Sequence, residues 1–206
     1  LPAREMDFAM KGNPWNVPRG FPGSHSLDLL HQSLDVFLKT GILSSPTFDK
    51  SLRDGKGDRS GWCELKSKIL ILEGWFVGCE PVSDLNNIDS LSEDKFNLSL
   101  SQDEKDYRSL IQESLIKYSK IWKKFDKIWH LKSSHFNNTI LWKTQQEEEM
   151  IKIRGSGLKG NNLTDFIRMI QSSIPQQSLS FINADTTVQI NQHRRIDKLL
   201  TTNYHF

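Results

Sequence analysis

The sequence predicts an α/β fold, in which a doubly wound parallel sheet is covered by helices on both faces. One observation is the run KILILEG at residues 68–74, a short and continuous apolar segment typical of a strand buried on both sides. Another is that helix-like segments alternate with candidate strands, which favours crossovers between parallel strands. At 206 residues, the chain is long enough for one domain with its own core.

The composition argues against several classes of protein. Hydrophobic residues make up 36% and charged residues 25%, as in globular proteins. The net charge of +2 is too small to indicate a nucleic-acid partner, and no apolar run approaches the roughly 20 residues that span a membrane. The cysteines, Cys63 and Cys79, lack the spacing of a metal site or a disulfide framework. We therefore expect a cytoplasmic protein with reduced thiols and no membrane or nucleic-acid partner.

The first third of the chain leads from a loop to a helix and then to a charged segment. Residues 1–24 are rich in Pro and Gly and predict a loop. A helix is expected from Ser24 or Ser26, either of which can cap it, to Gly41. Residues 48–62 hold three Asp, two Lys, two Arg and three Gly, which predicts a binding loop just before the 69–72 strand.

The rest of the chain alternates between helices and strands. Residues 84–106 carry seven acidic residues against two Lys and predict a solvated insertion. The elements expected after it are an amphipathic helix to about 125, a strand within 128–133, a charged helix over 138–153, a turn at 155–162, a helix over 163–175 and a last strand within 186–192.

Glu73 is the sharpest single candidate, because it ends the predicted strand. Ligands of open α/β sheets gather at the carboxyl ends of strands, and an acid there can hold a magnesium-bound water. The alternative is an acid that simply meets solvent where the strand ends.

The charged loop is a candidate anion site. Gly55 and Gly57 would let backbone amides approach a ligand, and Asp49 and Asp58 can accept hydrogen bonds from its hydroxyls. The cations that could bind the anion are Lys50, Arg53, Lys56 and Arg59. The alternative is a solvated loop whose charges pair weakly with one another.

A second candidate anion site is RGFPGSH at residues 19–25. It places Arg19 and His25 at the predicted start of a helix, although His25 can equally be a polar residue of the cap. The sequence contains no phosphate-binding GxxxxGK[ST] motif, and its histidines lack the spacing of a zinc site.

Six segments, in this order, resemble the D-glycerate 3-kinase family, P-loop kinases related to uridine kinase and phosphoribulokinase. The segments are RGFPGSHSLDLL, PTFDKSLRDGKGDR, ILILEGWFVG, YSKIWKKFDKIWHLK, LWKTQQE and INQHRR. The resemblance runs from about residue 13 to residue 195 and is most specific in the first three segments. It implies a P-loop-kinase-like sheet and transfer of the γ-phosphate of ATP to a hydroxyl of D-glycerate, with Mg²⁺.

The resemblance also implies roles for individual residues. The substrate contacts would be Arg19, His25, Asp49, Lys50, Asp58 and Arg59. Glu73 would be the catalytic acid at the end of a Walker-B-like strand, holding Mg²⁺ through a bound water. Lys143 would lie in a lid-like helical region over about 138–175, and Arg194 near the adenine of ATP.

The chain also departs from the family pattern. It begins at Leu1, and the resemblance implies that the family's phosphate loop, the phosphate-loop strand and the strand after it would precede this residue. Ser26 stands in place of an Asp, and Leu141 in place of a basic residue. We therefore expect residues 1–206 to form a single incomplete kinase-like domain that is inactive alone. The alternatives are a noncatalytic acceptor-binding remnant and a relative of nucleoside or pantothenate kinases; the oligomeric state is unknown.

Overall fold

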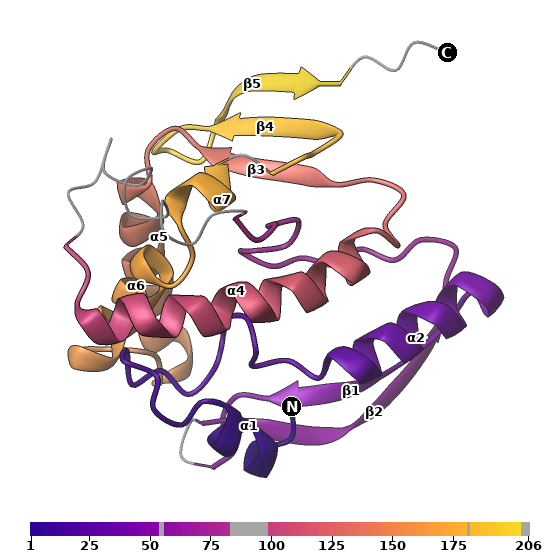
Figure 1. Cartoon of the computed structure of the whole chain (residues 1–206), viewed down its shortest axis with the longest axis horizontal. Helices are drawn as coiled ribbons and strands as arrows, with labels where there is room; N and C mark the ends of the chain where they lie inside the picture. The colour runs from indigo at the N-terminus through magenta and orange to yellow at the C-terminus, as the bar shows by residue number, and fades with distance from the viewer. Residues whose placement is uncertain (54–55, 83–98, 181, 203–206) are drawn as a thin grey trace. The chain divides into compact units, whose positions relative to one another are not determined.

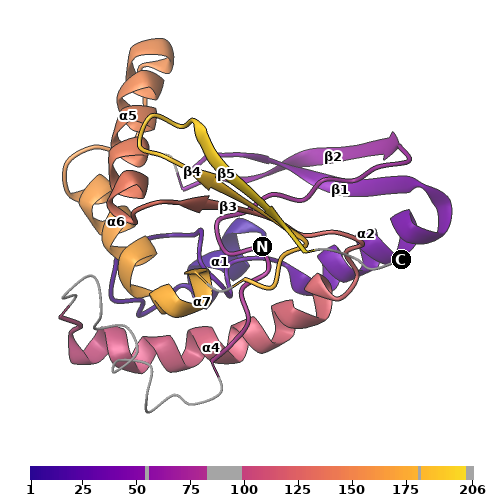
Figure 2. The same cartoon turned by 90° about the horizontal axis from the view of Figure 1, so that it is seen from above.

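The computed structural model describes residues 1–53, 56–82, 99–180 and 182–202, which form two compact units. Unit 1 comprises residues 1–13 and 17–77, and unit 2 comprises residues 14–16 and 78–206. Both units combine helices with strands, which confirms the α/β class (Figures 1 and 2). That residues 1–206 form one domain stays a prediction, because compactness alone does not measure independent folding.

The helices of unit 1 are α1 (Ala3–Ala9) and α2 (Leu27–Thr40). The predicted helix is confirmed by α2, whose end is fixed by Gly41 in the left-handed region, at φ 72°. The prediction of a loop over residues 1–24 is wrong at α1. Ala3 and Met6 are buried on one side of this short helix, and the surrounding Pro and Gly residues hid that spacing.

The strands of unit 1 form an antiparallel hairpin of β1 (Ile42–Asp49) and β2 (Asp58–Lys66). Residues 48–62 are therefore not all loop, and residues 50–57 alone connect the strands. Most of β2 is exposed, so its sequence lacks the apolar alternation that marks a half-buried strand. The hairpin is tied to α2 by Ser33, whose Oγ donates a 2.8 Å hydrogen bond to the carbonyl of Ser44.

The predicted strand at residues 69–72 is wrong. The segment has no regular secondary structure, and Ile69 and Ile71 are 75% and 84% exposed. A strand needs a neighbour for its backbone hydrogen bonds, and no described strand pairs with this segment. Glu73 therefore follows an exposed, extended segment and does not end a buried strand.

The strands of unit 2 form a mixed sheet in the order β3–β4–β5 (Figure 1). The strands β3 (Trp129–Ser133) and β4 (Thr186–Ile190) are parallel and confirm two of the predicted strands. The prediction that β4 is the last strand is wrong, because β5 (Ile196–Thr201) pairs with it in antiparallel fashion. All six residues of β5 are exposed, so burial leaves no pattern in its sequence.

The helices of unit 2 are α4 (Gln102–Trp122), α5 (Asn137–Arg154), α6 (Asn161–Ser172) and the short α7 (Gln176–Ser180). The predicted acidic insertion is wrong over 102–106, which begin α4, and its residues 84–98 lie outside the described residues. Ile111, Leu115 and Ile121 form the buried side of α4. No helix of the described residues is long and apolar enough to cross a membrane.

The carboxylate of Glu104 is a buried hub in unit 2. Its Oε1 accepts hydrogen bonds from Trp15 Nε1 (3.0 Å), Ser172 Oγ (3.0 Å) and Arg168 Nε (2.6 Å). Its Oε2 accepts bonds from Arg168 Nη2 (2.6 Å) and the Ser101 amide (2.9 Å), the latter completing a capping box. Burial alone would raise the pKa of Glu104, but the bonds from Arg168 and Ser101 lower it to about 2.

The substitution Glu104→Gln should destabilise the fold by about 3 kcal/mol at pH 7, because it leaves Arg168 without its buried counter-charge. The depressed pKa of Glu104 means that its stabilisation is complete above pH 4.5 and is lost as the pH falls towards 2. The difference between wild type and variant should therefore shrink over that window. Urea denaturation at pH 7, 4.5 and 3 measures it.

Glu113→Gln on the same helix is the matched control, since Glu113 is exposed. Equal unfolding free energies for the two variants at pH 7 would contradict the assignment of Glu104 as the hub.

Candidate acceptor and nucleotide sites

The end of the β1–β2 hairpin brings two of the predicted acceptor-site carboxylates together. The register pairs Asp49 with Asp58 directly across the strands, at the base of loop 50–57. Residues opposite each other in an antiparallel pair have their Cβ atoms about 5 Å apart on the same face. Lys50 and Arg59 follow these acids in the chain, so four of the six predicted substrate residues gather at this end of the hairpin.

Local hydrogen bonds hold both carboxylates. Asp49 accepts bonds from the amide (2.8 Å) and the hydroxyl (2.6 Å) of Ser51, and these bonds lower its pKa. Asp58 Oδ1 accepts bonds from the amides of Arg59 (2.8 Å) and Ala3 (3.0 Å), which lower the pKa of Asp58. Both acids therefore stay charged at neutral pH and are suited to accept hydrogen bonds from hydroxyl groups.

Arg19 reaches the same loop from a distant part of the chain. Its guanidinium donates to the carbonyl of Lys56 and lies 5.5 Å from the centre of the Phe48 ring. Burial lowers the pKa of Arg19. Gly57 makes this approach possible, because a Cβ there would lie 2.5 Å from the Phe48 ring and 2.9 Å from Arg19 Nη1. Arg19 thus joins the predicted cluster.

His25 ends the segment 19–25 that begins with Arg19, and a turn holds it in place. Gly20 donates its amide to Ser24 Oγ (3.1 Å) and accepts from Trp75 Nε1 (2.6 Å), which fixes the turn. The His25 ring lies 5.8 Å from Phe76. Although part of the residue is exposed, neighbouring groups displace water from the ring, and this desolvation, with a smaller effect of the amino terminus, lowers its pKa to about 4. Neutral His25 is thus a hydrogen-bonding group at pH 7 and not a cation.

Glu73 is not joined to this cluster by any contact of the described residues. It is exposed, and no hydrogen bond or ion pair joins it to Asp49, Lys50 or Arg59 among the described residues. The described residues also contain no group of three His, Cys, Asp or Glu side chains that could hold a metal ion. A single carboxylate is still compatible with Mg²⁺, which is often held by one or two acids, waters and substrate phosphates.

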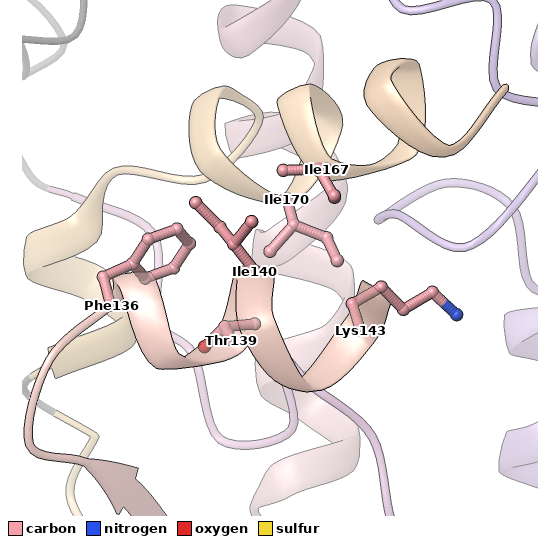
Figure 3. A pocket seen from close by; sticks show the side chains of 6 residues that line it. All are labelled: Phe136, Thr139, Ile140, Lys143, Ile167 and Ile170. Carbon is pink, nitrogen blue, oxygen red and sulfur yellow. The ribbon is translucent and has the colours of Figure 1, made fainter. Parts of the chain in front are cut away.

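Lys143, the predicted lid cation, is partnered on α5. Its ammonium group contacts the carboxylate of buried Glu147 one helical turn away and lies 4.7 Å from the centre of the Phe166 ring. Figure 3 shows the apolar seam between α5 and α6 beside it, where the ammonium group points away from Ile140 and Ile170. Glu147 also accepts a 2.7 Å bond from the amide of Leu158, so the carboxylate is anchored independently of Lys143.

Arg194 packs on Trp142, the residue that precedes Lys143 on α5. It lies in the turn between β4 and β5, in the left-handed region at φ 59°, and its guanidinium is 5.8 Å from the Trp142 ring centre. Trp142 Nε1 in turn donates a 2.9 Å bond to the carbonyl of Gln192. Arg194 of the β4–β5 turn thus contacts α5 at Trp142, the residue before Lys143. That the two cations belong to one nucleotide site stays a prediction.

The loop has one more organised cation, Arg53, which the resemblance does not assign. Arg53 lies in the left-handed region at φ 56°, and its Nη2 forms a 2.5 Å ion pair with Asp7 of α1. The sequence offers Arg53 as one of four loop cations. It contains no sign that Asp7, 46 residues away, is the partner, because α1 is not predicted.

The substitution Gly57→Ala should destabilise unit 1 by about 2–3 kcal/mol. A left-handed residue with a Cβ costs about 1 kcal/mol, and displacing the Phe48 ring adds a penalty of about the same size. Gly12→Ala is the control, with a similar φ of +79° and no atom within 4 Å of the new Cβ, and should cost about 1 kcal/mol. Urea denaturation compares the two variants, and equal losses would contradict the close packing around Gly57.

The sequence relatives of this chain are named as kinases, in agreement with the family that its motifs resemble. No family model matches the sequence. The chain is 27% identical to a Schizosaccharomyces pombe protein named uncharacterized kinase mug58, over 93% of this chain and 70% of the relative. It is 26% identical to the probable ATP-dependent kinase TDA10 of Saccharomyces cerevisiae, over 88% of this chain and 63% of the relative.

The solved structures agree with the sequence relatives. A D-glycerate 3-kinase from Cryptococcus neoformans var. grubii superimposes with a TM-score of 0.83 at 23% identity, covering 98% of this chain and 76% of that protein. The YGR205w protein superimposes with a TM-score of 0.71 at 24% identity, covering 100% and 75% of the two chains. This chain is therefore similar in sequence to two proteins named as kinases and similar in fold to a D-glycerate 3-kinase.

Proposed function

We propose that this chain carries the acceptor-binding part and the lid of a kinase that phosphorylates a hydroxyl of D-glycerate or a similar small hydroxy acid. The relatives named as kinases support the reaction class, and the solved D-glycerate 3-kinase supports the choice of acceptor. The single observation that carries the proposal is the gathering of Asp49, Lys50, Asp58 and Arg59, with Arg19, around one hairpin loop.

The chemistry of this cluster matches the proposed acceptor. A hydroxy acid needs a cation for its carboxylate and acceptor groups for its hydroxyl hydrogens. Asp49 and Asp58 are ionised at neutral pH, and backbone and side-chain donors lower their pKa values further, so both can accept a hydrogen bond from a hydroxyl. Phosphoryl transfer depends mainly on such positioning and on cations around the transferred group.

We assign the donor side of the reaction to Glu73, Lys143 and Arg194, with ATP and Mg²⁺ as cofactors. Glu73 would hold Mg²⁺ through a bound water, and the ion would neutralise phosphate charge. Lys143 would contact the phosphates after its ammonium group exchanges Glu147 for them, and Arg194 on Trp142 would lie beside the adenine. The probable ATP-dependent kinase among the relatives supports the nucleotide.

We also propose that this chain contributes strands to a doubly wound parallel sheet. Ile69 and Ile71 of unit 1 are largely exposed, and so are Trp129 (67%) and Leu131 (66%) of β3 in unit 2. Apolar strands of this kind are normally buried within parallel sheets. We propose that each segment pairs with a further strand, which the described residues do not supply, in the active kinase.

A second candidate is acceptor binding without catalysis. The observation that favours it is the absence of a GxxxxGK[ST] motif from the 206 residues, since this motif supplies the amides and the Lys that cradle the phosphates of ATP.

Titration calorimetry with D-glycerate tests the acceptor site directly. The wild-type chain should bind D-glycerate, and Asp58→Asn should weaken binding by about tenfold, because a hydrogen bond to a charged group contributes roughly 1.5–3 kcal/mol. Lys50→Gln should weaken binding less, since an exposed ammonium is a screened point charge.

Lys39→Gln, an exposed lysine of α2, controls for the loss of one positive charge. A chain that binds no D-glycerate, with or without ATP and Mg²⁺, would contradict the acceptor assignment. A thermal shift with ATP and Mg²⁺ then tests the donor residues: stabilisation by the nucleotide supports Glu73, Lys143 and Arg194, and stabilisation by D-glycerate alone supports acceptor binding without catalysis.

A further inference from the structure

Arg53 differs from the other cations of the hairpin loop in how its guanidinium is held. The ion pair with Asp7 fixes Nη2 at 2.5 Å, and it joins α1 to the loop across 46 residues of sequence. Asp7 is about half exposed and Arg53 about one third exposed, so the pair itself adds little to stability. Its effect is to orient the planar fork of Arg53.

The second guanidinium nitrogen of Arg53 is buried without a hydrogen-bond partner. Nη1 has no such partner among the described residues. A buried donor without a partner is costly, and in native proteins such a group commonly marks a site for a water, an ion or a ligand. Arg19 differs in this respect, because its Nη1 already donates to the carbonyl of Lys56.

Asp58 supplies an acceptor close to this donor. The charge of Arg53 contributes to the lowered pKa of Asp58, so the two groups interact electrostatically. Both hydrogen bonds received by the Asp58 carboxylate use Oδ1, and Oδ2 accepts none from the described residues. The backbone closes the loop between the two residues, because the amide of Gly57 donates a 2.8 Å hydrogen bond to the carbonyl of Leu52. A buried cationic donor and an open anionic acceptor therefore flank the same closed turn at the base of the loop.

We propose that Arg53 is the residue that selects an acceptor with a carboxylate, and that its Nη1 binds that carboxylate while Asp58 Oδ2 accepts a hydrogen bond from the adjacent hydroxyl. A 2-hydroxy carboxylate has both groups on neighbouring carbons, which matches one cationic donor beside one acceptor. Because Nη2 is held by Asp7, Nη1 keeps its direction, and in our proposal the ligand carboxylate displaces the side chains that cover Nη1 while Nη2 stays on Asp7. This assignment rests on the proposed function, since it names the specificity residue of the same site.

The experiment compares the binding of D-glycerate with that of D-glyceramide, which has the same hydroxyls and no charge, by titration calorimetry on the full chain. Wild type should bind D-glycerate about 10–100-fold more tightly than D-glyceramide, the ratio expected for one charge-assisted hydrogen bond. Arg53→Gln should reduce this ratio to about 1 by weakening D-glycerate binding alone. Arg53→Lys should keep part of the preference, because it retains the charge and loses the fork.

Arg4→Gln, an exposed arginine of α1, is the matched control and should leave the ratio unchanged. A merely structural role of Arg53 would weaken both ligands equally, so an unchanged ratio in Arg53→Gln overturns the assignment. If Asp58→Asn weakens D-glycerate while Arg53→Gln binds it as wild type does, the acceptor site stands and Arg53 is not its selector. If wild type binds neither ligand, the proposed function itself fails.

Discussion

The buried carboxylate of Glu104 is the interaction on which unit 2 most depends. A charge in the interior is tolerated only when hydrogen bonds and a counter-charge replace its water, and Glu104 receives five bonds from four residues. These donors come from the start of α4, from α6 and from Trp15, so a single group fixes the mutual positions of three segments. Because α6 packs beside α5, the hub also sets the frame for Lys143 and Arg194.

The hairpin loop of unit 1 is held in a different way. Its carboxylates depend on short-range donors, such as Ser51 for Asp49 and the backbone of Arg59 for Asp58, and its cations lie at or near the surface. Such contacts contribute little to stability but fix direction, which is what a binding site requires. Gly57 contributes to this arrangement because it lacks a Cβ atom, which leaves room for Arg19 to reach Phe48 and the loop carbonyl.

The sequence predicted α2, β3 and β4 but not α1, β2 and β5, for physical reasons visible in particular residues. The leucine spacing and Gly41, which are local signals, predict the helix α2. The strands β2 and β5 are largely exposed and carry no apolar alternation, and the 69–72 segment has strand composition without a partner. The hairpin register that unites Asp49 with Asp58, and the pairing of Arg53 with Asp7, are long-range contacts that no single sequence window contains.

The hairpin loop and Glu73, to which we assign acceptor binding and catalysis, differ in how the fold positions them. A loop between two hydrogen-bonded strands is positioned by its own hairpin, so the carboxylates of Asp49 and Asp58 have defined partners. An acid at the end of a central strand is positioned only by the strands that pair with that strand. The segment before Glu73 has no such partner among the described residues, and its Ile69 and Ile71 expose most of their apolar surface. Burying this surface between paired strands would be favourable by roughly 25 cal/mol per Å² of apolar area, so strand pairing and placement of the acid are one event. In the function we propose, an acceptor site that forms before this event binds its ligand without transferring a phosphate to it.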